Sequence, residues 1–415
     1  MKDISPKHGL STLVTHFSEG DNPHHSHITP IYQTSTFGFP DAETAAQVFT
    51  GDREGYFYTR SGNPNASQLA QKIAMLEALD LLKERPDEDI ETVVAGKVFA
   101  SGMAAVSAAI MGRAQAGDTI IAQRILYGNS YRFMSEIAPR IGLNVVWVDT
   151  PGREGWASAL ETHPDAVLAY AETPANPALF MVDLHELAEM TRGHKAWLIA
   201  DNTFATPYHQ RPLSLGCDVV VHSTTKYLAG HGFVLGGALI STHREYVGPA
   251  GGVGLIGRIL GAAPSPFDCW LANIGLKTFE LRMQRHAANA MTLAQWLSDH
   301  PKVEHVFYPG LEGHPGHDIA TRQMFNGFGG MMSFELRGGY DDAVKLMETL
   351  KLATLAVSLG NVDSLIEHPA SMTHKYVPPA ERLRAQITDG LVRFSVGIEN
   401  IEDIIADFEQ ALSMI

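Results

Sequence analysis

Short apolar runs, spaced along residues 98–221, constrain the fold of this chain more than any other feature of its sequence. Runs of three to six apolar residues predict strands buried on both faces of a sheet, and longer segments with room for a helix separate most of them. Strands that alternate with helices pair in parallel through crossover connections. The sequence therefore predicts an α/β protein with a mainly parallel sheet. The runs cover residues 98–100, 119–122, 143–148, 166–171, 197–200 and 217–221.

Charged and hydroxyl side chains follow two of these runs. Asp201 comes directly after the run 197–200, and Ser223, Thr225 and Lys226 follow the run 217–221. Open α/β sheets bind ligands at the carboxyl ends of their strands. A lysine that forms an imine and an aspartate that pairs with a pyridine nitrogen are the groups that pyridoxal phosphate (PLP) requires. The stretch 200–237 therefore indicates a PLP site, although a solvated lysine and a turn-capping aspartate would leave the same pattern.

Two further segments carry groups suited to a phosphate. Arg60 offers a planar fork of donors, and the Tyr58 hydroxyl stands beside it. A junction after the run 98–100 opens a helical stretch, where backbone amides bind anions. The alternative to phosphate binding is an aromatic turn for the first segment and an ordinary strand-to-helix junction for the second. The junction consists of Ser101, Gly102 and Met103.

Two single residues suggest further ligand contacts. Tyr127 follows the run 119–122, and its ring is suited to stacking on an aromatic ligand or to a half-buried position. Arg393 places a charge inside the apolar segment 391–397, which is unfavourable without a partner. A substrate carboxylate would be a bidentate partner, and a structural salt bridge is the alternative.

These segments resemble motifs of the Cys/Met-metabolism PLP-dependent (trans-sulfuration) enzymes, and the resemblance covers nearly the whole chain. The family includes cystathionine γ-synthase, the cystathionine lyases, methionine γ-lyase and O-acetylhomoserine sulfhydrylase. Membership implies PLP as cofactor, the type I PLP-dependent transferase fold, which is aspartate aminotransferase-like, and a homotetramer arranged as a dimer of dimers. The matching elements are YTRSGNP at 58–64, SGMAA at 101–105, LYG at 126–128, ETPANP at 172–177, STTK at 223–226 and RFSVGIE at 393–399.

The resemblance implies a role for each motif residue. Lys226, Tyr127 and Asp201 would be catalytic: Lys226 as the cofactor lysine and proton carrier, Tyr127 as stacking ring and acid, and Asp201 as partner of the pyridine nitrogen. Tyr58 and Arg60 would reach the cofactor phosphate of a neighbouring subunit, and Glu172 would support the site. The cofactor contacts would be Tyr58, Arg60, Ser101, Gly102, Met103, Tyr127, Asn176, Asp201, Ser223, Thr225 and Lys226, and the substrate contacts Asn129, Val357, Ser358 and Arg393.

The choice of substrate depends on Val357, where the cystathionine-handling branches usually have glutamate. An apolar side chain there favours a short, uncharged tail such as a thiomethyl or acetyl group, and the sequence around it most resembles methionine γ-lyase. The resemblance therefore implies a carbon–sulfur lyase that forms 2-oxobutanoate, ammonia and a thiol from methionine-like substrates. Asn129, where those lyases usually have cysteine, and Phe233 in place of an aspartate keep O-acetylhomoserine sulfhydrylase and the cystathionine enzymes open. A PLP aminotransferase and a non-catalytic PLP protein are further alternatives.

The organisation along the chain follows from composition and resemblance together. Residues 1–62 have few periodic runs and carry apolar side chains such as Ile28 and Ile31, which predicts an arm that contacts a neighbouring subunit. A PLP-binding domain is expected at 63–270, and a smaller C-terminal α/β domain at 271–415. The repeat GVGLIG at 252–257 lacks the context of a dinucleotide site and predicts a mobile, glycine-rich segment.

Composition narrows the class of protein further. The net charge is −15 without a basic block, which argues against nucleic acid and anionic membranes as partners. Cys217 and Cys269 stand in apolar contexts, and the N-terminus lacks the apolar core of a signal peptide, so a cytoplasmic protein is expected. The histidines at 24, 25 and 27 have no acidic or cysteine partner at ligand spacing, so no metal site is expected.

Overall fold

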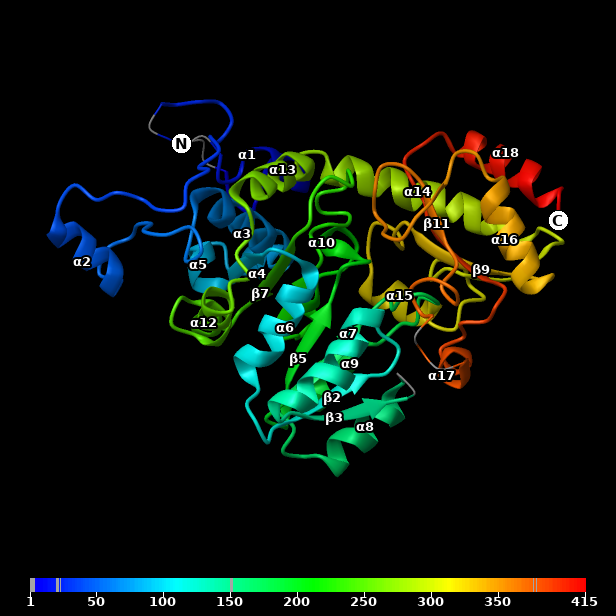
Figure 1. Cartoon of the computed structure of the whole chain (residues 1–415), viewed down its shortest axis with the longest axis horizontal. Helices are drawn as coiled ribbons and strands as arrows, with labels where there is room; N and C mark the ends of the chain where they lie inside the picture. Colours follow the sequence, from blue (N-terminus) through cyan, green and yellow to red (C-terminus); the bar gives the residue numbers. More distant parts are fainter. Residues whose placement is uncertain (1–3, 20–21, 23, 150–151, 376, 378) are drawn as a thin grey trace.

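The computed structural model describes residues 4–19, 22, 24–149, 152–375, 377 and 379–415, and two sheets organise it (Figure 1). The larger sheet has seven strands in the order β1-β7-β6-β5-β4-β2-β3. All except β7 run in the same direction, so the predicted mainly parallel sheet is confirmed. Its strands are β1 (Ala95–Phe99), β2 (Thr119–Gln123), β3 (Asn144–Val148), β4 (Leu168–Glu172), β5 (Trp197–Asp201), β6 (Val219–His222) and β7 (Gly237–Ser241).

Helices cover the larger sheet because its central strands are apolar on both faces. Every residue of β4 is buried, as are those of β6 and β7, so the sheet needs cover on each side. The helices along this part of the chain are α3 (Pro64–Glu77), α4 (Leu79–Glu84), α5 (Ile90–Val93), α6 (Gly102–Arg113), α7 (Gly128–Arg132), α8 (Arg153–Thr162), α9 (Leu184–Arg192), α10 (Thr206–His209), α11 (Arg244–Val247) and α12 (Gly252–Ile259).

The glycine repeat at 252–257 is a helix, α12, and the expectation of a mobile segment was wrong. Its first glycine lies directly on the backbone of Gly112 in α6, where a Cβ would overlap it. Gly257 approaches Phe99, and a Cβ there would lie 3.1 Å from its ring. The glycines therefore allow close packing of α12 on α6, which periodicity alone does not reveal.

A smaller mixed sheet forms the second part of the chain, in the order β10-β11-β12-β9-β8. Figure 1 shows α14 running into this part from the end of α13. A cluster of buried apolar side chains joins the sheet to α14, α16 and α18. The elements are α13 (Pro266–Leu276), α14 (Phe279–Ser298), β8 (Val303–Phe307), α15 (His317–Gln323), β9 (Met331–Leu336), α16 (Gly339–Thr349), β10 (Thr354–Leu355), β11 (Leu365–Glu367), α17 (Pro379–Arg384), β12 (Leu391–Ser395) and α18 (Ile401–Leu412).

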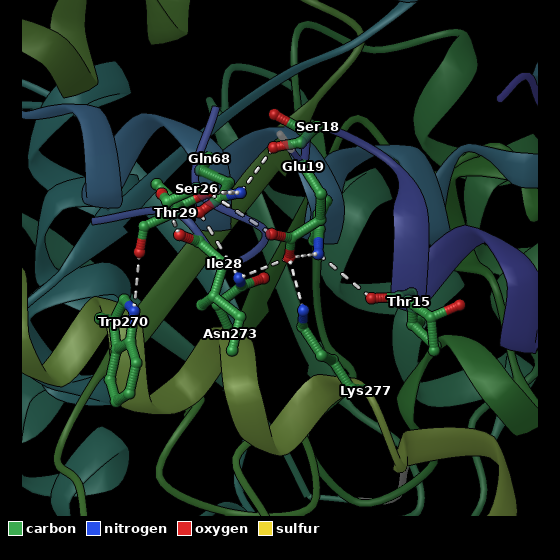
Figure 2. A network of polar contacts seen from close by, with 12 residues as sticks. Thr15, Ser18, Glu19, Ser26, Ile28, Thr29, Gln68, Trp270, Asn273 and Lys277 are labelled. Carbon is green, nitrogen blue, oxygen red and sulfur yellow. Dashed lines mark hydrogen bonds and ion pairs between the residues drawn. The ribbon is translucent and has the colours of Figure 1, made fainter. Parts of the chain in front are cut away.

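The N-terminal region carries α1 (Leu10–His16) and α2 (Ala42–Thr50), and Figure 1 shows α2 projecting away from both sheets. Ile28 and Ile31 each have 40% of their surface exposed. The segment is fixed at its base by polar contacts to α3 and α13, which Figure 2 shows from close by. Trp270 donates its indole N–H to the Thr29 carbonyl at 2.9 Å, and Gln68 donates to the Thr29 hydroxyl at 2.8 Å.

Glu19 is the charged centre of these contacts. Its carboxylate accepts from Lys72 at 2.7 Å, from Asn273 at 3.0 Å and lies 3.2 Å from Lys277. The Lys72 side chain is fully buried, and burial lowers its pKa to about 8 against the attraction of Glu19. Two segments far apart in the sequence, at Lys72 and at Asn273–Lys277, therefore hold the start of the arm on the body of the protein.

Candidate active site

The candidate site begins where strands β4, β5 and β6 end side by side. Glu172 and Asp201 are the last residues of β4 and β5, and they are paired in register. The turn after β6 carries Lys226. Strand order, rather than sequence distance, therefore brings two carboxylates and a lysine to the same edge of the sheet.

Lys226 contacts the smaller part of the chain. Its Nζ donates to the Ser358 hydroxyl at 2.7 Å. Burial, together with the charge of Arg393, lowers the pKa of Lys226 to about 8 against the opposing charge of Glu367. The free amine, which a nucleophile or base requires, is therefore available much closer to neutral pH than in an exposed lysine.

Ser358 has a strained backbone, with a φ of 104°. Residues other than glycine seldom adopt this backbone conformation, and functional sites often retain such strain. In this conformation Ser358 presents its hydroxyl to Lys226. Its carbonyl accepts a hydrogen bond from Arg393 Nη2 at 2.8 Å. One residue thus joins the lysine and the arginine.

Arg393 lies in the middle of β12, only 5% exposed. Its Nη1 donates to Asn176 Oδ1 at 2.9 Å and lies 3.0 Å from Glu367 Oε1, directly opposite in β11. A guanidinium has five N–H donors. Within the part of the chain that the structure describes, three of these have partners, which leaves Nε and one hydrogen of Nη2 to receive a carboxylate.

Glu367 is a site residue that the sequence reasoning missed. Arg393 was expected to pair either with a substrate or with a structural carboxylate, and the structure supplies the structural partner while leaving donors free. The available signal was a second charge at the end of another short apolar run, 365–366, followed by Glu367. Without the strand pairing, nothing in the sequence connects the two charges.

Asp201 and Glu172 form a buried acidic pair. Asp201 accepts from the Thr203 hydroxyl at 2.6 Å and from Tyr170 at 3.3 Å, and burial nevertheless raises its pKa. Burial, followed by the charge of Asp201, raises the pKa of Glu172, and the backbone amides of Asn176 and Tyr127 oppose this shift by hydrogen-bonding its carboxylate. Two buried carboxylates at the ends of neighbouring strands favour the binding of a positively charged ligand group beside them.

The first turn of α6 contacts the turn that carries Lys226. The Ser101 hydroxyl caps α6 by accepting from Ala104 at 3.1 Å. A Cβ at Gly102 would lie 2.8 Å from the Ser223 side chain, so glycine permits this approach. The Ser130 hydroxyl donates to the Met103 sulfur at 3.8 Å. The helix amides and Ser223 are therefore adjacent, as an anion site requires.

Thr225 is engaged within the protein. Its hydroxyl accepts from the Gly236 amide at 3.0 Å and lies 3.3 Å from the Gly236 carbonyl. A ligand phosphate would compete with the carbonyl for the hydroxyl hydrogen. The expected contact of Thr225 with a cofactor thus remains a prediction.

The two expected specificity residues lie at the rim. Asn129 is exposed and donates to the Tyr127 hydroxyl at 2.9 Å, and Tyr127 is itself 40% exposed. Val357 is 54% exposed and precedes Ser358 in the chain. Both residues are accessible to a ligand that approaches Lys226.

Tyr58 and Arg60 are not brought to Lys226 by the fold of one chain. Arg60 donates to the Arg258 carbonyl in α12 at 2.9 Å, and its guanidinium lies 5.4 Å from the centre of the Tyr58 ring. Both residues are exposed. Their expected contact with a cofactor therefore requires a second chain.

Arg282 in α14 is a supporting residue without a signal in the sequence. It donates to the carbonyls of Tyr227 at 2.7 Å and Gly275 at 2.9 Å, so it fixes the chain directly after Lys226. Gly230, with a φ of 74°, leaves the space that its guanidinium fills. The helical path breaks between α13 and α14, and Arg282 spans this break through its bond to Gly275.

Comparison with known proteins decides the family. A sequence model of the Cys/Met metabolism PLP-dependent enzymes matches residues 11–413. The chain belongs to this family. It is 46% identical over 410 residues to an L-methionine γ-lyase of Fusobacterium nucleatum subsp. nucleatum, covering 99% of each protein. An L-methionine γ-lyase of Porphyromonas gingivalis is 42% identical over 412 residues, covering 99% of this chain and 98% of the relative.

A solved structure agrees in fold as well as sequence. Cystathionine γ-synthase from Xanthomonas oryzae pv. oryzae, in complex with aminoacrylate and cysteine, superposes with a TM-score of 0.88 at 35% identity, covering 98% of each chain. The expected type I PLP-dependent transferase fold is thereby confirmed, and PLP is the cofactor of the family.

The residues of this chain fit PLP. Burial raises the pKa of both Asp201 and Glu172, and the protonated pyridine nitrogen of PLP would place a positive charge beside them. Lys226 has the lowered pKa that imine formation needs. The Asn176 Nδ2 atom is buried without a protein partner, so it has a donor to offer a ligand oxygen.

Proposed function

We propose that this protein is a PLP-dependent carbon–sulfur lyase that performs γ-elimination on methionine and similar substrates. The products are 2-oxobutanoate, ammonia and a thiol, from the amino acid and one water molecule. The observation that carries the proposal is the convergence of Lys226 and Arg393 on Ser358. The amine that removes an α-proton and the guanidinium that binds an α-carboxylate therefore both contact Ser358. This places them close enough together to act on one α-amino acid.

Each protein group has a defined task in this reaction. Bound PLP supplies an electron-accepting ring that stabilises negative charge beside the substrate nitrogen. Arg393 binds the substrate carboxylate with its two remaining donors. The Lys226 amine removes the Cα proton, gives this proton up and then removes a Cβ proton, because its pKa of about 8 suits both accepting and releasing protons. Asp201 keeps the positive nitrogen of the ring protonated.

The leaving group departs at the rim of the site. Tyr127 has an accessible hydroxyl that protonates the departing sulfur, and the bond from Asn129 orients this hydroxyl. Val357 offers an apolar surface to a thiomethyl group, and a charged distal ammonium finds no carboxylate in that side chain. This combination favours methionine over cystathionine.

Assays of the purified protein with PLP test the function. Methionine, cystathionine, and O-acetylhomoserine with sulfide are offered separately, and 2-oxobutanoate, methanethiol and homocysteine are measured. We expect methanethiol and 2-oxobutanoate from methionine. Homocysteine from the acetyl ester alone would instead assign a sulfhydrylase, and preferential cleavage of cystathionine would assign a cystathionine enzyme. Transamination without thiol release would assign an aminotransferase.

The proposal includes how the chain is organised and assembled. We divide it into an arm at 1–62, a PLP-binding domain at 63–270 and a C-terminal domain at 271–415, with four chains forming a dimer of dimers. The exposed apolar arm, and the contact of the exposed Arg60 with α12, support active sites shared between neighbours. A cytoplasmic location agrees with two free, buried cysteines. Within the described residues, no helix is long and apolar enough to cross a membrane.

Arg60→Ala tests the shared site. Loss of a charge-assisted contact to the cofactor phosphate should weaken PLP binding by about 1.5–3 kcal/mol. The measurement is a PLP titration of the apoprotein, followed by absorbance. Arg53→Ala is the matched control, because Arg53 is an exposed arginine of the same region whose side chain bonds Thr44. Equal PLP affinity in both variants would reject the role of Arg60.

A further inference from the structure

Glu172 joins two segments that the proposed function places against the cofactor. It ends β4 and is 4% exposed. Its Oε2 accepts from the Tyr127 amide at 2.8 Å, and its Oε1 accepts from the Asn176 amide at 2.9 Å. Both carboxylate oxygens are therefore used, each by a different loop at the carboxyl edge of the sheet.

The backbone of Glu172 is held in place by the neighbouring strand β2. The Glu172 amide donates to Gln123 Oε1 at 3.1 Å, and Gln123 donates onward to the Ile125 carbonyl at 2.7 Å. Gln123 is fully buried at the end of β2. Glu172 therefore starts from a rigid strand end, and its side chain transmits that rigidity to the two loops.

Each of the two loops carries a different part of the site. One presents the Tyr127 ring and hydroxyl. The other presents Asn176, which has a free Nδ2 donor and an Oδ1 that accepts from Arg393 at 2.9 Å. Movement of the Asn176 backbone would therefore displace both a cofactor contact and the guanidinium that faces the substrate.

We infer that Glu172 is a positioning residue that fixes the Tyr127 ring and the Asn176 amide together through its two carboxylate oxygens, and thereby sets PLP binding and the placement of Arg393. The inference rests on the proposed function for the roles of Tyr127 and Asn176. Its bridging requires two acceptor oxygens and the full length of the glutamate side chain. A negative charge at this position is not sufficient for the bridging.

Two variants separate these requirements. Glu172→Gln keeps the length but replaces one acceptor by an amide donor, which leaves one buried backbone N–H unpaired. Glu172→Asp keeps the charge and both acceptors but is one methylene shorter, so it cannot span both loops. We expect each variant to bind PLP on the order of 10- to 100-fold more weakly. The visible circular dichroism of bound PLP should fall, and KM for methionine should rise more than kcat falls.

Asp218→Asn provides the control for a purely structural carboxylate. Asp218 precedes β6 at the opposite end of the sheet, where it accepts from the Leu198 amide at 2.8 Å and from His243 at 2.7 Å. This variant should lower the melting temperature and leave PLP affinity and circular dichroism unchanged. Glu172 variants that behave in the same way would overturn the inference, as would a Glu172→Asp protein indistinguishable from wild type.

The cofactor readouts need no amino-acid substrate, so they separate this inference from the proposed function. A wild-type protein that does not cleave methionine would reject the function and leave the PLP titrations interpretable. A wild-type protein that cleaves methionine, together with Glu172 variants of unchanged PLP affinity and dichroism, would reject only the role of Glu172.

Discussion

Replacing Lys226 with alanine should abolish turnover, with kcat lower by roughly 10²- to 10⁴-fold or more. The variant removes the amine that binds the cofactor and that transfers both substrate protons. Alanine leaves the Ser358 hydroxyl without its donor, but it retains the apolar packing of the neighbouring turn. The loss should therefore be catalytic, with little change in fold.

The amine acts through its environment as well as its position. Burial lowers the pKa of Lys226 to about 8, and Arg393 acts in the same direction. A group with this pKa alternates between base and acid at neutral pH, which two successive proton transfers demand. For this reason an external amine such as methylamine should restore part of the activity, because it supplies a mobile base without the side chain.

Three measurements establish the result for Lys226→Ala: kcat with methionine, the visible absorbance of bound PLP, and far-ultraviolet circular dichroism. We expect the first to collapse, the second to change its spectrum, and the third to match wild type. Lys345→Ala is the control, since Lys345 is an exposed lysine on α16. An unchanged PLP spectrum in Lys226→Ala would assign the cofactor to a different lysine.

The sequence predicted the framework of the site because strand ends follow local rules. Apolar runs placed Asp201 and Lys226 at or just after the ends of two strands, and in the structure Asp201 ends β5 and Lys226 lies in the turn after β6. Parallel pairing then brings such ends to one edge. These inferences needed only the apolar pattern and the residue that follows each run.

Contacts between distant segments could not be predicted in this way. Pairing of Glu367 with Arg393 depends on the register between β11 and β12. The insertion of β7 between β1 and β6, antiparallel to both, likewise depends on pairing across more than 100 residues on one side. Strand patterns specify that a segment pairs, but not its partner.

The glycine repeat of α12 failed for a related reason. Glycine lowers helix propensity, so the pattern at 252–257 favoured a mobile segment. The structure uses the missing side chains for close approach to α6, and this tertiary packing outweighs propensity. The benefit of a glycine in packing is invisible until its neighbour is known.

Glu19→Ala should destabilise the protein by about 3–5 kcal/mol, because it leaves the buried ammonium of Lys72 without its partner. In the wild type, burial alone would raise the pKa of Glu19, but Lys72 and the hydrogen bonds around it lower this pKa instead. The carboxylate is therefore ionised and also binds Asn273 and Lys277. Its loss releases the base of the arm from both α3 and α13.

The effect should depend on pH in a defined direction. The pKa of Lys72 falls from 10.5 to about 8 on folding. Between these values the unfolded chain binds more protons than the folded one, so the contribution of Lys72 to stability increases as the pH rises through this window. Without Glu19 the pKa of Lys72 falls further, and a neutral amine costs less to bury. The difference in the free energy of unfolding between the variant and the wild type should therefore be larger at pH 6 than at pH 9.

Urea unfolding of the wild type and of Glu19→Ala at pH 6 and pH 9 measures this gap. Glu304→Ala is the control, because Glu304 forms an exposed ion pair with Arg337, and such pairs contribute little to stability. A gap in the free energy of unfolding that does not shrink at pH 9 would mean that Lys72 stays charged without Glu19. A Glu19→Ala protein as stable as the control would mean that the arm is held by the apolar contacts of α1, and that the ion pair only determines where its first turn lies.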